Sequence, residues 1–159
     1  MKTIEACLTE NLSGSALQTA LAFAAFLREN GISCIRDEGF WRDKIYFMLK
    51  LREGYVGYIA IKDPDEPENL WTVWSDGEDS HWYAEAMPID EILSSAIRHI
   101  DYCVHCGSCS GGKQRRIFGR DFENVCGTTF RIDNPRTEDL PFLEYMIQMR
   151  KDEISTQEV

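Results

Sequence analysis

The sequence predicts a single α+β domain in which helices cover an antiparallel sheet. Between residues 43 and 52, apolar side chains alternate with others at a period of two, as in a half-exposed strand. Between residues 88 and 102, apolar residues recur at steps of three and four, which is the period of an amphipathic helix. A length of 159 residues suits one compact domain. We expect that domain to span residues 1–154, followed by a frayed tail at 155–159.

The first half predicts one helix followed by adjacent strands. The helix spans residues 15–30, with Ser15 as a suitable N-cap and Gly31 as the residue that ends it. Short turns at 53–54 and 63–68 separate the strands, so we expect an antiparallel meander of three strands or more. The predicted strands span residues 43–52, 55–61 and 70–75.

The second half predicts two helices around a short β-rich segment. The amphipathic helix runs from 88 to 102 and ends where the cysteines begin, and His99 lies off its apolar stripe, on the surface. A final helix begins at Thr137 and places Arg150 and Lys151 at the negative end of its dipole. Two short strands between these helices span 114–118 and 128–132.

Charge and hydropathy exclude several classes of partner. The net charge is −10, from 27 acidic against 17 basic residues, which disfavours non-specific binding to nucleic acid or to an anionic membrane. No apolar run reaches the ~18 residues of a spanning helix, and the start lacks a secretory pattern. We therefore expect a cytoplasmic protein, where clustered cysteines bind metal more often than they form disulfides.

Four cysteines form the most informative motif. Cys103, Cys106 and Cys109 follow one another at three-residue steps, and Cys126 comes later. Cys-x2-Cys turns direct neighbouring thiolates at one tetrahedral ion, and four sulfurs leave no open position for catalysis. The sequence therefore predicts a structural zinc site that pins residues 103–132.

Other interpretations of the cysteines stay open. The spacing matches part of a ferredoxin run, so an iron–sulfur cluster is an alternative, as is a metal-free redox set. His105 could replace one sulfur, or lie in solvent. Cys7 and Cys34 stand apart, and we expect both to be small buried apolar residues. Four basic residues after the cluster are expected to offset its negative charge, with a phosphate-binding patch as the alternative: Lys113, Arg115, Arg116 and Arg120.

Aromatic residues are the second candidate site. Three tryptophans, a tyrosine, a histidine and an aspartate lie within residues 71–83, and further aromatic residues could join them at one end of the sheet. Aromatic walls with a few polar groups are typical of small-molecule pockets. A core layer followed by a turn explains the same residues. The candidate pocket residues are Trp41, Tyr58, Trp71, Trp74, Asp76 and His81, of which the last two could form an orienting pair.

Five segments carry a resemblance to other proteins: 40–46, 71–76, 101–107, 118–126 and 130–135. They resemble segments of a family of small uncharacterised bacterial proteins with a C-terminal Cys-x2-Cys-x2-Cys…Cys cluster. The resemblance covers roughly residues 40–150 and implies a bacterial protein, but no particular chemistry. The layout is also loosely similar to YdhG-like α+β domains.

The function expected from these features is that of a cytoplasmic, zinc-stabilised binding or interaction protein without evident catalysis. A small-molecule binder or enzyme using the aromatic residues is one alternative, and a thiol redox or iron–sulfur sensor is another. No phosphate loop, nucleophile elbow or His-Glu-x-x-His motif occurs. The partner is expected to be a protein or a small molecule.

Overall fold

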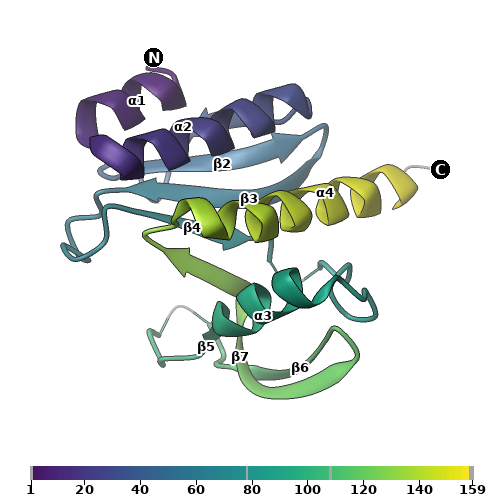
Figure 1. Ribbon diagram of the computed structural model, residues 1–159. Coiled ribbons are helices and arrows are strands. Elements are labelled where there is room, and N and C mark those ends of the chain that lie inside the picture. The colour runs from purple at the N-terminus through teal and green to yellow at the C-terminus, as the bar shows by residue number, and fades with distance from the viewer. Residues whose placement is uncertain (1, 78, 108, 158–159) are drawn as a thin grey trace.

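A computed structural model describes residues 2–77, 79–107 and 109–157 of the chain. It confirms the α+β class: these residues form a seven-stranded sheet, with antiparallel pairing throughout, and four α-helices. The helices α1, α2 and α4 lie together over one face of the sheet, and α3 lies nearer its β5–β7 end (Figure 1).

Two helices open the chain where one was predicted. Helix α1 (Ile4–Asn11) is capped by Thr3, whose hydroxyl accepts a hydrogen bond from the Ala6 amide at 3.2 Å. Helix α2 (Gly14–Glu29) confirms the predicted helix but begins one residue earlier. Ser13 rather than Ser15 therefore stands in the cap position, and its side chain makes no capping hydrogen bond.

The predicted meander is confirmed and extended by one edge strand. Strands β2 (Ile45–Leu51), β3 (Gly54–Ile61) and β4 (Trp71–Ser75) pair in sequence order. Strand β1 (Ser33–Arg36) pairs with β2 and was not predicted, because four residues give too short a pattern to recognise.

The amphipathic helix is shorter than predicted. Helix α3 (Asp90–Arg98) stops four residues early, and strand β5 (Ile100–Tyr102) follows it. The prediction of helix through residue 102 was wrong because Ile100 continues the apolar stripe yet pairs with Phe130 of a later strand. His99 ends the helix and is half-buried, with Nε2 3.2 Å from Asp139 Oδ1, so the prediction of a surface histidine was also wrong.

One long strand organises the second half. Strand β6 (Lys113–Ile117) matches its prediction closely, whereas β7 (Arg120–Asp133) is 14 residues long and far exceeds the five predicted. The C-terminal part of β7 pairs with β4, and the rest pairs with β5 and β6. The order of strands is β1-β2-β3-β4-β7-β5, with β6 also paired to β7.

The chain closes with a 3-10 turn at Thr137–Asp139 and helix α4 (Leu140–Gln157). The helix continues through three of the five residues for which a frayed tail was expected. Glu158 and Val159 lie outside the described residues. Since α4 extends this far, Arg150 lies within the helix rather than at its end, and it is buried.

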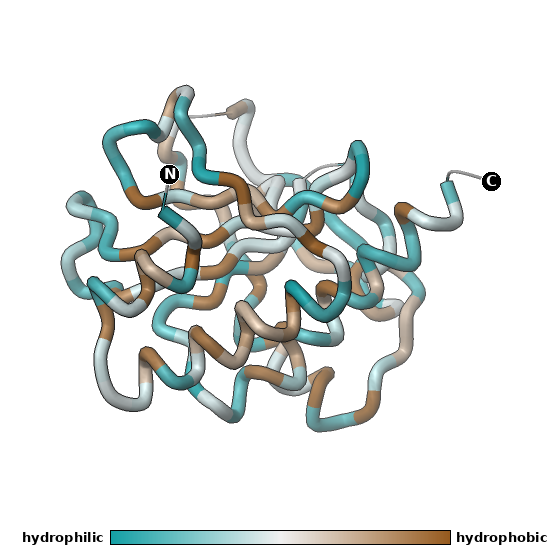
Figure 2. Tube along the Cα trace, turned by 90° about the horizontal axis from the view of Figure 1, so that it is seen from above, coloured by the Kyte–Doolittle hydropathy of each residue, from teal (hydrophilic) through white to brown (hydrophobic). Residues whose placement is uncertain are grey.

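The core lies between the helices and the sheet. Hydrophobic and hydrophilic stretches alternate along the trace when the molecule is seen from above (Figure 2). No described helix has both the length and the apolarity that crossing a bilayer requires. The largest fully buried side chains include Trp71, Phe23, Phe47, Phe130 and Phe142.

Candidate functional site

The cysteine loop, residues 103–112, crosses from one edge of β7 to the other. It leaves β5, which pairs with one edge of β7, and enters β6, which pairs with the opposite edge. Tyr102 and Lys113, on either side of the loop, both pair with Val125. The sheet therefore holds the two ends of the loop level with Val125, on opposite edges of β7.

The first cysteine is fixed to β7 by the backbone. The Cys103 amide donates to the Asn124 carbonyl at 2.8 Å, and the Asn124 side chain donates to the Cys103 carbonyl at 3.3 Å. At the other end of the loop, a Cβ on Gly112 would stand only 2.7 Å from Cys103 Cβ and 2.4 Å from Asn124 Oδ1. This position therefore requires glycine for close approach of the loop to β7.

Three of the four predicted cysteine ligands share one hollow. Cys103, Cys106 and Cys109 line a cavity of about 140 Å³ together with His105. The Nδ1 atom of His105 lies 4.0 Å from Cys103 Sγ. The structure thus brings the three loop cysteines and one imidazole to the same surface depression.

The loop backbone already directs amides at two sulfurs. The His105 amide lies 3.3 Å from Cys103 Sγ, and the Gly111 amide lies 3.4 Å from Cys109 Sγ. Positive φ angles of 56° at His105, 83° at Gly107 and 109° at Gly111 turn the chain back in this way. Both sulfurs therefore already have a backbone donor on the side of the loop.

Cys126 lies beside the loop without lining its hollow. It is half-buried on β7, and its thiol donates a hydrogen bond to the Asp101 carboxylate, which also accepts from the Thr128 hydroxyl at 3.0 Å. Burial raises the pKa of Asp101, and the Thr128 hydrogen bond opposes that rise. Asp101 was missed as a neighbour of the cluster, although it precedes Cys103 by two residues in the sequence.

The sulfurs are not drawn together around a point. Among residues 2–77, 79–107 and 109–157, no three histidine, cysteine, aspartate or glutamate side chains converge closely enough to hold a metal ion. Binding of a metal ion would require the cysteine side chains to rotate toward a common point in the hollow. The predicted basic counter-charges also have other partners: Arg115 donates to the Tyr83 hydroxyl at 3.0 Å, and Arg116 pairs with Glu85 at 2.7 Å.

Comparison with protein-family models, curated proteins and solved structures finds no match for this chain. The resemblance to small bacterial proteins stays a prediction, and the chemistry of the site rests on its own residues.

The aromatic candidates divide between the two faces of the sheet. Trp71 is 1% exposed and packs against Phe23 of α2, with ring centroids 6.4 Å apart. Trp74 lies three residues further along β4 and points to the opposite face, because strand side chains alternate. There it lies 6.0 Å from the ring of Tyr46, and the Arg131 guanidinium stands 5.1 Å above it.

Tyr46 is the centre of an aromatic band that the sequence did not identify. Its ring lies 5.9 Å from both Trp41 and Tyr58, so the structure brings three of the predicted pocket residues together around it, counting Trp74. Burial raises the pKa of Tyr58 to about 12. The sequence signal that could have identified Tyr46 is its position among the outward-facing residues of its strand.

Asp76 and His81 do not form the pair considered from the sequence. Asp76 is buried and its carboxylate lies 2.8 Å from Arg150 Nη2. His81 is exposed, and its backbone amide donates to Glu153 at 2.8 Å. Both residues therefore help to anchor the surrounding loop to α4.

The two isolated cysteines, Cys7 and Cys34, lie in a different environment from the cysteines of the loop. Cys7 is buried, as predicted, and Cys34 is half-buried and packed against the core. Burial raises the pKa of the Cys34 thiol to about 11, while Arg28 opposes that rise. At about pH 8 only a very small fraction of this thiol is ionised.

We expect iodoacetamide to label the exposed Cys106 and Cys109 well before Cys34 in chelator-treated folded protein at about pH 8. Because the thiolate reacts, the labelling rate of Cys34 should rise about tenfold per pH unit as the pH approaches 11. Peptide mapping by mass spectrometry measures each site. Equal rates for Cys34 and Cys109 at about pH 8 would contradict the environment described for Cys34.

Proposed function

We propose that the cysteine loop binds one zinc ion and that the protein is a zinc-stabilised binding or interaction module. Three ligands are Cys103, Cys106 and Cys109. The observation that carries the proposal is their common hollow, in which amides already point at two of the three sulfurs. Tetrahedral thiolate coordination is the arrangement that structural zinc favours.

Two residues compete for the fourth position. Cys126 completes an all-cysteine set and would have to exchange its hydrogen bond to Asp101 for the metal. His105 lies in the hollow itself, near Cys103, and would give a Cys₃His set. Both sets are known for structural zinc, and both fill the coordination shell.

The interaction role is supported by the side chains beside the cluster. Tyr102 is 47% exposed and Val104 is 82% exposed, so apolar surface flanks the first cysteine on both sides. An ion that fixes the loop would hold these side chains in one arrangement toward a partner, lowering the conformational cost of association.

The test is metal content with matched variants. We expect about one zinc per chain in purified protein, and loss of that zinc in the serine variants of Cys103, Cys106 and Cys109. Cys34→Ser is the control and should keep the metal, because Cys34 lies in β1.

Cobalt substitution distinguishes the two ligand sets. Sulfur-to-cobalt charge-transfer absorption increases with the number of thiolates, so Cys126→Ser should lower it under the all-cysteine set, and His105→Ala should leave it unchanged. Under the Cys₃His set, Cys126→Ser should leave this absorption and the metal affinity unchanged, and His105→Ala should weaken metal binding instead. Protein that takes up no zinc would refute the proposal, and visible absorption that bleaches on reduction would favour the iron–sulfur alternative.

A further inference from the structure

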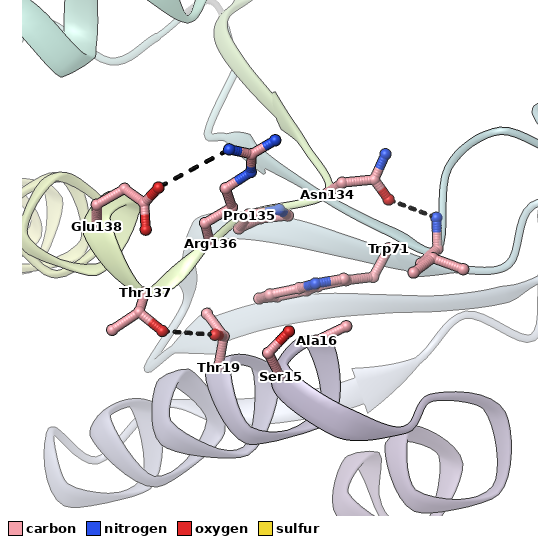
Figure 3. A pocket seen from close by; sticks show the side chains of 10 residues that line it. Ser15, Ala16, Thr19, Trp71, Asn134, Pro135, Arg136, Thr137 and Glu138 are labelled. Carbon is pink, nitrogen blue, oxygen red and sulfur yellow. Dashed lines mark hydrogen bonds and ion pairs between the residues drawn. The ribbon is translucent and has the colours of Figure 1, made fainter.

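A second cavity lies between the start of α2 and the segment that joins β7 to α4. Its volume is about 250 Å³, or about eight water molecules at ~30 Å³ each. Figure 3 shows the indole of Trp71 lying between Pro135 and the first turns of α2. None of its lining residues belongs to the cysteine loop.

The floor of this cavity holds a polar atom without a partner. The Nε1 atom of Trp71 is buried, and no acceptor for it is found among the residues that the structure describes. An indole N–H can only donate, and a buried donor left without an acceptor destabilises the folded state. In Figure 3 the ring is seen nearly on edge, with its nitrogen between the α2 side chains and Pro135. An acceptor supplied by a ligand would satisfy it.

A second donor comes from a pair of threonines. The hydroxyls of Thr19 and Thr137 lie 3.1 Å apart and bridge α2 to the 3-10 turn, and Thr19 is 3% exposed. One hydroxyl donates its hydrogen to the other. The second hydroxyl can then donate its own hydrogen into the cavity.

Positive potential adds to these donors. The first amides of α2 lack a side-chain cap, and Ser15 and Ala16 of that turn line the cavity. The Arg136 guanidinium stands at the rim, with its nearest carboxylate, on Glu138, 4.0 Å away. Both side chains are largely exposed, so this ion pair is weak and leaves the arginine free to turn inward.

The remaining walls are apolar. Ala16, Leu70, Pro135 and the indole face surround the donors. Inorganic phosphate would present oxygens to these walls as well as to the donors. An acid with a small hydrocarbon body would place acceptors at one end only, as the cavity requires.

We propose that this cavity binds the carboxylate of a small organic acid, with the Trp71 indole and the Thr19–Thr137 hydroxyl pair as donors. Arg136 closes over the carboxylate from the rim. The site is independent of the metal site.

The test follows the indole resonances of the ¹⁵N-labelled full chain. The protein has 4 tryptophans, and Trp71→Phe identifies the signal of interest. Isobutyrate should shift that signal saturably, with half-saturation at about 1 mM or below. Isobutyramide, which has the same shape without the charge, and inorganic phosphate should give no saturable shift.

Two variants probe the donors separately. Thr19→Val keeps the shape and removes a hydroxyl, and it should weaken isobutyrate binding about tenfold. Arg136→Gln alters an exposed residue, so the fold is retained, and it should weaken binding several-fold. Arg98→Gln, on the exposed face of α3, is the matched control and should bind as the natural chain does.

Several results would overturn the proposal. They are the absence of a saturable shift with isobutyrate, an equal response to isobutyramide, saturation by phosphate alone, and unchanged affinity in both donor variants. The other three indole signals check that each variant keeps its fold.

Discussion

Replacing Arg150 with methionine is expected to lower the free energy of unfolding by about 3–5 kcal/mol. The guanidinium lies 2.8 Å from Asp76, pairs with Glu153 and donates from Nε to the Tyr55 carbonyl at 3.0 Å. The charged side chains are at most 14% exposed. Methionine fills a similar volume but leaves two buried carboxylates without a counter-charge.

The loss should depend on pH. Burial raises the pKa of Asp76, and Arg150 opposes that rise. Without Arg150 the folded chain binds the Asp76 proton more tightly than the unfolded chain does, so lowering the pH favours the folded state. The deficit of Arg150→Met should therefore shrink as the pH is lowered from neutral toward the acidic range, as measured by urea unfolding.

Two further variants test this explanation. The double variant Asp76→Asn with Arg150→Met should recover part of the loss, because one uncompensated charge is removed. Lys151→Met removes the same charge from the next residue of α4 and should change stability by less than about 1 kcal/mol. Equal losses at positions 150 and 151 would contradict the role of the buried network.

Phe130→Ala should have an effect of similar size, about 3–5 kcal/mol. The Phe130 ring is fully buried on β7 and is surrounded by four others, with centroid distances of 5.2 Å to Phe142, 5.8 Å to Trp82, 5.9 Å to Tyr83 and 6.2 Å to Phe118. These rings come from α4 and two loops. Truncation leaves a cavity that such differently anchored segments fill poorly.

Thermal and urea unfolding measure the loss, and two substitutions calibrate it. Phe130→Leu retains most of the volume and should cost less than Phe130→Ala. Phe40→Ala removes a ring that is 87% exposed and should change stability by about 0.5 kcal/mol or less. A loss at Phe130 no larger than that at Phe40 would show that the aromatic cluster does not stabilise the fold.

The elements predicted well are those fixed by local pattern. The alternation in β2 and the turns around it gave the meander, since register and burial there depend on nearby residues. Residues 100–102 show the opposite case. Their apolar spacing continues that of α3, and only pairing with β7, distant in sequence, makes them a strand. Single-chain periodicity does not contain that information.

The candidate site follows the same division. The spacing of Cys103, Cys106 and Cys109 predicted residues that share one hollow. The placement of Cys126 depends on how β7 pairs, and its carboxylate neighbour was missed for that reason. The aromatic pocket was grouped by composition, although the three-residue step from Trp71 to Trp74 already places their side chains on opposite faces of a strand.

The long strand β7 has a consequence for synthesis of the protein. Thr72 on β4 meets Asp133 on β7 across 61 residues of chain, and Thr19 meets Thr137 across 118. Strands β4 and β5 both pair with β7, so neither has this partner until β7 has left the ribosome. We therefore expect the nascent chain to stay unfolded, and to need protection from aggregation, until β7 and the turn that follows it have been translated.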